Sequence, residues 1–339
     1  MDLAELTTLR VGGPAAEVVD ATDAGELVAA VREADEAGRP LLLVAGGSNL
    51  VVADDGFDGR VVLVRSRGIT VSADACSGAS VTVAAGEPWD AFVRTAVERG
   101  WVGVEALAGI PGSVGATPIQ NVGAYGQEVA DTIASVRTWD RRESRIRTLA
   151  AADCGFAYRH SRFKADPRRF VVLDVTFQLP LGDLGAPVGY AELARSLHVQ
   201  VGDRAPAADV REAVLRLRAG KGMVLDESDH DTWSAGSFFT NPLLGPEVAA
   251  SLPADAPRFD QPDGTVKTSA AWLIDRAGFG RGHGEGAARL STKHTLALTN
   301  RGGATAADLL ALAREVRDGV RQQFGVDLQP EPVLVGCRL

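Results

Sequence analysis

The sequence predicts a soluble, globular protein that contains both helices and strands and has more than one domain. At 339 residues the chain is long enough to form two or three domains around a substantial core. Apolar residues make up 45% of it and charged residues 23%, which is the composition of an ordinary globular protein. Short apolar strands alternate with amphipathic helices in the first third of the chain, and both kinds of element recur later, so both contribute to the core.

The first third shows this alternation most clearly. A helix is expected over 23–37, because Asp23 and Glu26 have capping-box spacing and Gly38 follows its end. The next stretch, 41–45, is an apolar strand that runs into a pair of glycines. Further strands are expected at 50–53, 61–64 and 81–85, followed by a helix at 89–98.

The later elements follow the same rules. The last helix, 306–324, has Thr305 as its cap, and Gly325 ends it. The acidic stretch 226–231 is predicted to be an exposed loop at a domain boundary. The other expected elements are strands at 135–139, 170–177 and 333–335 and helices at 209–218 and 271–277.

Composition argues against several classes of protein. A net charge of −9 disfavours a nucleic-acid partner, and no apolar run is long enough to span a membrane. The N-terminus does not have the pattern of a secretory signal. The cysteines Cys76, Cys154 and Cys337 are too widely spaced for a disulfide framework or a zinc site, which fits a reducing cytoplasm. The histidines show no metal-ligand spacing, so no metal site is expected.

Two glycine-rich stretches are candidate ligand sites. The longer, 103–128, carries apolar side chains throughout. Since glycine lacks a Cβ and tolerates positive φ, this pattern predicts backbone pressed against a large, flat, partly anionic ligand. A buried loop that turns tightly between strands is the alternative. The shorter stretch, Gly46-Gly47-Ser48-Asn49, could cradle phosphate with backbone N–H groups, or could be a plain β-turn. It is neither a P-loop nor a dinucleotide fingerprint.

Four short segments combine reactive side chains with a restrained backbone. They centre on Arg159 beside Tyr158, on Ser237 before two phenylalanines, on Lys267, and on Glu331 between two prolines. Each has a structural alternative: a surface ion pair for Arg159, a turn cap for Ser237, and solvated charges for the other two. No hydrolase triad is visible, since Ser237 does not lie in a Gly-x-Ser-x-Gly motif.

Taken in order, the motifs resemble those of the UDP-N-acetylenolpyruvoylglucosamine reductase (MurB) family of bacterial cell-wall synthesis. They are GGSNLVVADDGFDG, GIPGSVGATPIQNVGAYGQE, YRHSRFK, Tyr190, AGSFFTNP, KTSAAWLID and QPEP, and the resemblance covers about residues 7–336. It implies a two-lobed FAD-binding domain of the vanillyl-alcohol-oxidase (PCMH) type, followed by an α/β substrate-binding domain. The implied borders are 1–70 for the first lobe, 71–222 for the second, to which the strand region 326–339 returns, and 223–325 for the substrate domain.

The resemblance implies a bound, non-covalent FAD, with NADPH as cosubstrate. Gly46 to Asn49 would surround the pyrophosphate, and 109–125 would lie along the ribityl chain and the isoalloxazine. The residues implied to bind the cofactor are Ala45, Gly46, Gly47, Ser48, Asn49, Ile110, Pro111, Gly112, Ser113, Gly115, Ala116, Ile119, Gln120, Asn121, Gly123, Ala124 and Tyr125.

The implied reaction reduces an enol ether, UDP-N-acetylglucosamine enolpyruvate, to UDP-N-acetylmuramate. Hydride passes from NADPH to the flavin and then to the vinyl C3 of the substrate. Ser237 matches the family's proton donor to C2. Arg159 and Glu331 match the groups that polarise the substrate carboxylate and stabilise the enol. The cofactor supplies the hard chemistry, and the protein supplies alignment, charge and one proton.

Other positions match the family's substrate contacts. Tyr190 matches a tyrosine on a loop that closes over the nucleotide, and Arg218 with Lys221 matches a diphosphate-binding basic pair. The sequence departs from the family at Phe259, where a tyrosine is frequent, and at His294, where Gln or Glu is usual. The remaining implied substrate contacts are Tyr158, Asn241 and Lys267, with His294 in its altered form.

Two other functions stay open. A flavin oxidase that uses O₂ on a sugar or hydroxy acid would share the fold, but it gives no role to Ser237, Arg159 and Glu331. A catalytically silent nucleotide-sugar-binding protein would be expected to have lost one of these three residues. The setting that the resemblance implies is peptidoglycan precursor synthesis in the cytoplasm, which serves cell-wall biogenesis, cell shape and division. We expect a monomer with no nucleic-acid partner and no membrane insertion.

Overall fold

The computed structural model describes residues 1–74 and 78–339, so Cys76 lies outside the described residues. Packing divides this part of the chain into two compact units. We call Ala16–Gly46 with Asp58–Ala219 the central unit, and Met1–Ala15 with Gly47–Phe57 and Gly220–Leu339 the terminal unit. The border at Gly220 lies close to the predicted one after residue 222, whereas the predicted first lobe, 1–70, is divided between both units.

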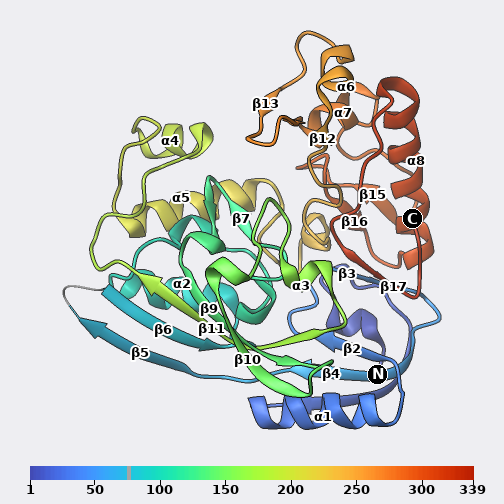
Figure 1. Cartoon of the computed structure of the whole chain (residues 1–339). Coiled ribbons are helices and arrows are strands. Elements are labelled where there is room, and N and C mark those ends of the chain that lie inside the picture. Colours follow the sequence, from blue (N-terminus) through green and yellow to red (C-terminus); the bar gives the residue numbers. More distant parts are fainter. Residues whose placement is uncertain (75–77) are drawn as a thin grey trace. The chain divides into compact units, whose positions relative to one another are not determined.

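The central unit is built on a five-stranded antiparallel sheet with the order β10-β9-β11-β6-β5 (Figure 1). These strands are β5 (Ile69–Asp74), β6 (Gly78–Ala84), β9 (Ile133–Asp140), β10 (Arg145–Ala150) and β11 (Phe170–Leu179). A second sheet, with the order β1-β4-β2, contains β1 (Ala15–Ala21), β2 (Leu41–Val44) and β4 (Phe57–Val64). The helices are α1 (Ala24–Glu36), α2 (Trp89–Glu98), α3 (Arg162–Ala165), α4 (Ala191–Leu197) and α5 (Ala207–Gly220). Shorter elements are β7 (Gly123–Ala124), β8 (Gln127–Glu128) and the 3₁₀ helices η2 (Glu105–Leu107), η3 (Val114–Ala116), η4 (Val129–Asp131) and η5 (Ala151–Asp153).

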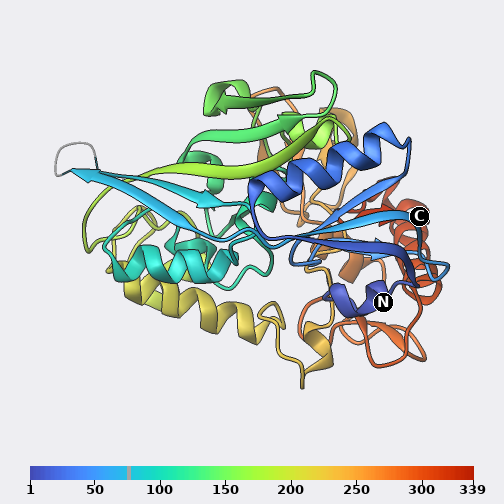
Figure 2. The same ribbon diagram turned by 90° about the horizontal axis from the view of Figure 1, so that it is seen from below.

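Strand β11 is buried on both faces because α1 and α2 pack on opposite sides of the sheet (Figure 2). Leu173 belongs to the cluster that α1 forms with the sheet. A β-bulge between Val172 and Asp174 then shifts the alternation of side chains. Phe177 therefore faces α2, where its ring stacks on that of Phe92 with the centroids 4.9 Å apart. One hydrophobic strand thus joins two cores.

The terminal unit contains the longest helix, α8 (Ala306–Phe324). Thr305 and Asp308 form a reciprocal capping box, and Gly325 ends the helix with a φ of 68°, as the sequence predicts. None of the described helices combines the length and apolar character needed to cross a bilayer. The other elements are η1 (Leu3–Leu6), β3 (Leu50–Val52), η6 (His230–Thr232), β12 (Leu243–Leu244), α6 (Pro246–Ser251), β13 (Phe259–Asp260), β14 (Val266–Lys267), α7 (Ala270–Arg276), β15 (Ala288–Leu290), β16 (Leu298–Asn300) and β17 (Val333–Val335).

The last strand pairs differently from the prediction. Strand β17 runs parallel to β3, with Val333 opposite Leu50 and Val335 opposite Val52. The expectation that this strand returns to residues 71–222 is therefore wrong. Since β3 directly follows the shorter glycine motif and β17 begins two residues after Glu331, their pairing brings those two motifs together.

The acidic stretch is exposed only in its first half. Asp226 and Glu227 are exposed, but Asp231 is only 4% exposed. The prediction of a solvent loop is wrong for Asp231, because its carboxylate accepts hydrogen bonds from Thr292 and Arg301. A carboxylate can be buried when donors of this kind replace water.

A second buried carboxylate holds the turn between β9 and β10. Asp140 accepts from Arg169 Nε at 3.0 Å and Nη2 at 2.7 Å, and also from the backbone N–H groups of Arg142 and Glu143. The Arg169 hydrogen bond is the main reason why the pKa of Asp140 lies below its ordinary value. A carboxyl group with a depressed folded-state pKa stabilises the fold above its unfolded-state pKa, and this stabilisation is lost as the pH falls through the folded-state value.

We therefore expect Asp140→Asn to lower the free energy of unfolding at pH 7. The difference from the wild type should shrink as the pH falls below about 4, where the carboxylate of the unfolded wild type becomes protonated and that of the folded protein follows. Urea unfolding of both proteins at pH 7 and pH 3 measures it. A difference of the same size at both pH values would contradict this linkage.

Candidate active site

Hydrogen bonds fix the start of the glycine-rich segment in the central unit. Gly109 N donates to Asp90 Oδ1 at 2.7 Å, and Gly115 N donates to Ala85 O at 2.8 Å. A Cβ on Gly115 would lie 2.5 Å from the Cβ of Ala85. At Gly115 the backbone thus lies against the protein itself and not against a ligand. This position fits the alternative interpretation of the segment, a buried loop that turns tightly. Nothing in the sequence singles out Asp90, which positions the segment from the first turn of α2.

Within the central unit, the first glycine of the shorter motif touches the longer glycine-rich segment. A Cβ on Gly46 would lie 2.6 Å from the Cα of Gly112, so side chains larger than hydrogen would separate the two backbones. Ala45 and Gly46 are exposed, whereas Gly112 is half-buried. The structure thus brings together two segments that the sequence assigns to the same cofactor.

Two polar side-chain atoms of this segment fit a bound ligand. Ser113 Oγ and Gln120 Oε1 are buried, and neither has a hydrogen-bond partner among the described residues. Leaving one such group unsatisfied costs about 1–3 kcal/mol. Both residues are among those that the sequence predicts to contact the flavin. Their orphaned atoms suit a polar cofactor that packs against the segment.

Asn121 shapes the next turn of the chain. It is 1% exposed and adopts a left-handed φ of 45°. Its Nδ2 donates to Glu128 Oε2 at 2.6 Å and to Ala157 O at 3.1 Å, while its Oδ1 accepts from Ala130 N at 3.2 Å. The protein thus holds this side chain from three sides. Its predicted contact with the flavin stays a prediction.

Arg159 lies beside this turn. Tyr158 and Arg159 are the middle residues of a turn that Ala157 and His160 close with two backbone hydrogen bonds. Arg159 has a left-handed φ of 50°, and its Nη2 donates to Gly123 O at 2.8 Å. The guanidinium also lies over the Tyr158 ring, 5.4 Å from its centroid. The predicted cation is therefore held against the predicted flavin segment, with its backbone in an uncommon conformation.

The two remaining tyrosines meet in the same unit. The rings of Tyr125 and Tyr190 pack edge to face with centroids 5.7 Å apart, and a Cβ on Gly126 would lie 2.9 Å from the Cα of Gly189. Tyr190 is 48% exposed and directly precedes α4. The structure thus places the predicted substrate tyrosine on the predicted flavin segment.

Arg218 supplies a buried positive charge to this part of the central unit. The residue is 9% exposed, and burial lowers the pKa of its guanidinium to about 10, against the opposing influence of Tyr125 and Asp90. An arginine with that pKa stays cationic at neutral pH. Such a charge suits an anionic ligand.

In the terminal unit, the rest of the shorter glycine motif is fixed to the Glu331 segment. Gly47 has a left-handed φ of 58°, and a Cβ there would lie 1.7 Å from Leu6 O. Asn49 O accepts from Val333 N at 2.9 Å, and Asn49 Nδ2 donates to Glu331 O at 3.4 Å. A predicted phosphate-binding loop and a predicted catalytic carboxylate are therefore neighbours.

The Ser237 segment lies on the other side of Glu331. Phe238 O accepts from Glu331 N at 2.8 Å, and Phe239 forms a β-bridge with Pro330. Both phenylalanines are 1% exposed, which confirms the packed wall that the sequence predicts beside Ser237. Ser237 itself is half-buried. The structure thus places two of the three predicted catalytic residues on adjacent, hydrogen-bonded segments.

The other predicted substrate residues of the terminal unit are half-buried. Asn241 Oδ1 accepts from Ala270 N at 3.0 Å, so this amide helps to start α7. Lys267 stands in the middle strand of a small sheet, opposite both Leu243 and Phe259. His294 accepts from Leu296 N through Nδ1 at 3.0 Å. Lys221, in the same unit, is also half-buried.

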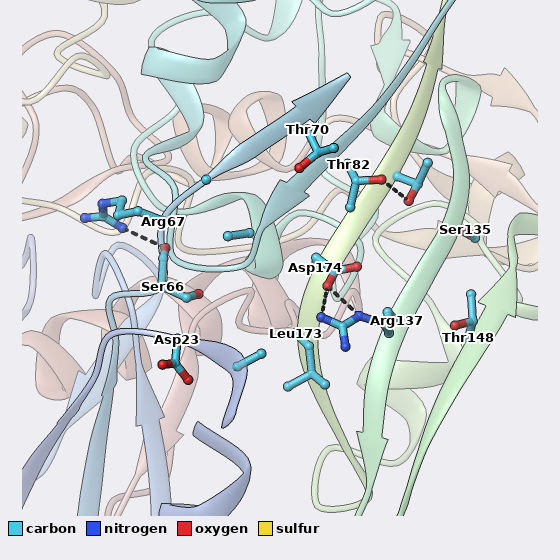
Figure 3. Close-up of a pocket in the computed structure, with 14 residues that line it drawn as sticks. Asp23, Ser66, Arg67, Thr70, Thr82, Ser135, Arg137, Thr148, Leu173 and Asp174 are labelled. Carbon is cyan, nitrogen blue, oxygen red and sulfur yellow. Dashed lines mark hydrogen bonds and ion pairs between the residues drawn. The ribbon is translucent and has the colours of Figure 1, made fainter. Parts of the chain in front are cut away.

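A polar groove of about 520 Å³ lies elsewhere in the central unit (Figure 3). It contains none of the residues that the motifs assign to cofactor or substrate. Asp174 accepts from Arg137 Nε at 2.6 Å, and Thr82 shares a 2.9 Å hydrogen bond with Thr176. These cross-strand pairs join neighbouring strands of the five-stranded sheet.

Cysteine and metal chemistry find no support in the described chain. Burial raises the pKa of Cys154 to about 11 and also raises that of Cys337, so both are thiols at neutral pH. Within residues 1–74 and 78–339, no group of three or more His, Cys, Asp or Glu is arranged to hold a metal ion.

Known protein families match both the N-terminal and the C-terminal part of this chain. A family model described as an FAD binding domain matches residues 15–149, and one described as the C-terminal domain of UDP-N-acetylenolpyruvoylglucosamine reductase matches 227–335. A UDP-N-acetylenolpyruvoylglucosamine reductase of Cutibacterium acnes is 58% identical over 340 residues, which cover 99% of this chain and 90% of that protein. The enzyme of that name from Streptomyces coelicolor is 59% identical with the same coverage.

A solved structure is also similar over the full length. The crystal structure of UDP-N-acetylenolpyruvylglucosamine reductase (MurB) from Thermus caldophilus has a TM-score of 0.65 and 26% sequence identity. The match covers 99% of this chain and 97% of that one. The expected fold class, an FAD-binding α+β domain followed by a substrate domain, is therefore confirmed.

Proposed function

This chain belongs to the UDP-N-acetylenolpyruvoylglucosamine reductase family, and from that membership we propose that it reduces UDP-N-acetylglucosamine enolpyruvate to UDP-N-acetylmuramate. The observation that carries the proposal is the identity of 58% over nearly the entire chain. We further propose NADPH as the reductant, peptidoglycan precursor synthesis as the pathway and the cytoplasm as the location.

The protein's residues fit a bound FAD. Ser113 Oγ and Gln120 Oε1 offer unsatisfied polar atoms, and the backbones of Gly46 and Gly112 approach each other too closely for side chains. We propose that these residues, with Gly47 to Asn49 and the backbone up to Tyr125, hold the cofactor without a covalent bond. When bound there, FAD would supply the transfer of hydride from NADPH to the substrate.

Ser237 is the proposed proton donor to C2 of the substrate. Hydride added at C3 leaves an electron pair at C2. This pair takes the proton of the Ser237 hydroxyl and forms the C2–H bond of the saturated product. A serine hydroxyl is a weak acid, so it needs a fixed position and neighbouring charges to act. The buried phenylalanines after Ser237 and the hydrogen bond from Glu331 N to Phe238 O support such a position.

Arg159 and Glu331 are the proposed partners of the substrate carboxylate. The Arg159 guanidinium can neutralise the negative charge that develops as the enol forms. Two prolines flank Glu331 and hold its backbone extended, which restricts where its carboxyl group can point. Tyr158, Tyr190, Arg218, Lys221, Asn241, Lys267 and His294 are the proposed contacts of the nucleotide sugar.

Product analysis tests the proposed function. The purified protein should release a yellow flavin on heat denaturation, and with NADPH it should convert the enolpyruvyl nucleotide into a product heavier by two hydrogens, as measured by mass spectrometry. Steady formation of hydrogen peroxide with no such product would indicate an oxidase. Nucleotide binding without turnover would indicate a silent binding protein.

A further inference from the structure

Within the terminal unit, residues 291–297 connect the acidic stretch 226–231 to the segment that carries Ser237. We call them the 291–297 loop. The loop closes on itself, since Ser291 N donates to Ala297 O at 2.8 Å and Ala297 N donates to His294 O at 3.2 Å. Ser291 Oγ also accepts from the N–H groups of Lys293 and His294. The loop therefore has a defined shape that one anchor can fix.

The loop holds the segment that carries Ser237. Leu296 O accepts a 2.7 Å hydrogen bond from Phe238 N, the residue directly after Ser237. Phe238 O in turn accepts from Glu331 N at 2.8 Å. The loop, the Ser237 segment and the Glu331 segment thus form one hydrogen-bonded row within the terminal unit, and a shift of the loop would move both proposed catalytic residues.

Asp231 anchors the loop at its other end. Its Oδ1 accepts from Thr292 N and from Arg301 Nη1, both at 2.8 Å, and its Oδ2 accepts from Thr292 Oγ1 at 2.6 Å. Asp229, two residues earlier, pairs with Lys293 Nζ at 2.5 Å. The end of the acidic stretch, which the sequence assigns to solvent, therefore holds the loop in place.

Asp231 also touches the segment that carries Lys221. A Cβ on Gly222 would lie 3.0 Å from Asp231 O, so the backbone directly after Lys221 packs on Asp231.

Burial by itself raises the pKa of Asp231, but the hydrogen bonds of Thr292 and Ser291 and the charge of Arg301 outweigh it and lower the pKa overall. The anchor is thus an ionised, buried carboxylate at neutral pH.

We propose that Asp231 is a positioning residue for the proton-transfer step: it fixes the 291–297 loop and thereby the backbone that presents Ser237 and Glu331. This inference rests on the proposed function of those two residues. It requires a carboxylate, because Thr292 and Arg301 donate three hydrogen bonds to its two oxygens. An asparagine offers one oxygen and turns two N–H donors towards Thr292 or Arg301.

The test separates the two half-reactions of the flavin-loaded enzyme in Asp231→Asn. Reduction of the bound flavin by NADPH should stay within about twofold of wild type. Reoxidation by saturating enolpyruvyl nucleotide should slow at least about tenfold, since a small misplacement of a catalytic group lowers the rate steeply. Hydrogen exchange of the amides of Phe238 and Leu296 should be faster than in the wild type.

Asp226→Asn is the matched control. Asp226 belongs to the same acidic stretch and is exposed, and its carboxylate accepts from Ser228. Both half-reactions of this variant should equal those of the wild type.

Two results with Asp231→Asn would overturn the inference. Reoxidation at the wild-type rate would do so, and so would an equal loss in both half-reactions, which a general structural defect would cause. If wild-type enzyme itself is not reoxidised by the nucleotide, the proposed function fails first and the inference fails with it.

A second pair of variants decides the matter if Asp231→Asn does not fold. Thr292→Ser keeps the hydroxyl that Asp231 accepts from, whereas Thr292→Val replaces it with a methyl group of similar size. Slow reoxidation in Thr292→Val, with a normal rate in Thr292→Ser, supports the positioning role. Equal rates in the two variants contradict it.

Discussion

Replacing Ser237 with alanine is expected to slow the overall reduction by about 10²–10⁴-fold, the range typical for loss of a general acid. The first half-reaction should remain close to wild type, because reduction of the flavin by NADPH does not need a proton at C2 of the nucleotide. Stopped-flow absorbance of the bound flavin measures both steps separately. The expected result is a variant that bleaches normally with NADPH and recovers its colour very slowly with the enolpyruvyl nucleotide.

The matched control is Ser251→Ala. Ser251 lies in the same unit, and its hydroxyl donates to Val248 O on the surface. This variant should behave as the wild type in both steps. Near wild-type product formation by Ser237→Ala would remove Ser237 from the mechanism and leave the resemblance to the family as an argument for the fold alone.

The second large effect is expected from Gly46→Ala. The backbone conformation of Gly46 lies outside the left-handed region, so alanine meets no torsional strain there. Its Cβ would instead lie 2.6 Å from the Cα of Gly112, and one of the two backbones must move. Because both glycines belong to proposed flavin segments, we expect the affinity for FAD to fall by at least about tenfold, which corresponds to about 1.4 kcal/mol. Fluorescence titration of the flavin-free protein with FAD measures the change.

Gly245→Ala serves as the control for this substitution. Gly245 has a φ of −63°, and a Cβ there would meet no heavy atom of the described residues within 4 Å. FAD affinity should therefore be unchanged in this variant. Equal affinities for Gly46→Ala and the wild type would mean that the contact with Gly112 is not part of the cofactor site.

The sequence predicts well those features of the fold that depend on residues close together in the chain. Asp23 caps α1 through Glu26 N, and Thr305 with Asp308 caps α8, because capping depends on residues only three positions apart. Even so, the Glu26 carboxylate accepts from Thr22 rather than completing a box with Asp23. Strands β1, β5 and β10 escape prediction, since their polar and charged residues weaken the apolar pattern.

Pairing between distant residues is the part that sequence patterns do not determine. The partner of β17 is β3, more than half the chain away, and no local signal identifies it. Asp231 is buried because Thr292 and Arg301 lie 61 and 70 positions further along the chain. Sequence patterns identify Ser237 and Glu331 as reactive, whereas their attachment to one hydrogen-bonded row depends on tertiary structure.

An anaerobic titration of the purified protein tests most directly whether it reduces the enolpyruvyl nucleotide through a bound flavin. NADPH is added to the yellow, flavin-loaded enzyme, and the enolpyruvyl nucleotide follows after the colour has bleached. We expect prompt recovery of the flavin absorbance, with one equivalent of UDP-N-acetylmuramate formed. Recovery that waits for air would contradict it and indicate an oxidase, and purification without bound flavin, with no uptake of added FAD, would contradict the cofactor site itself.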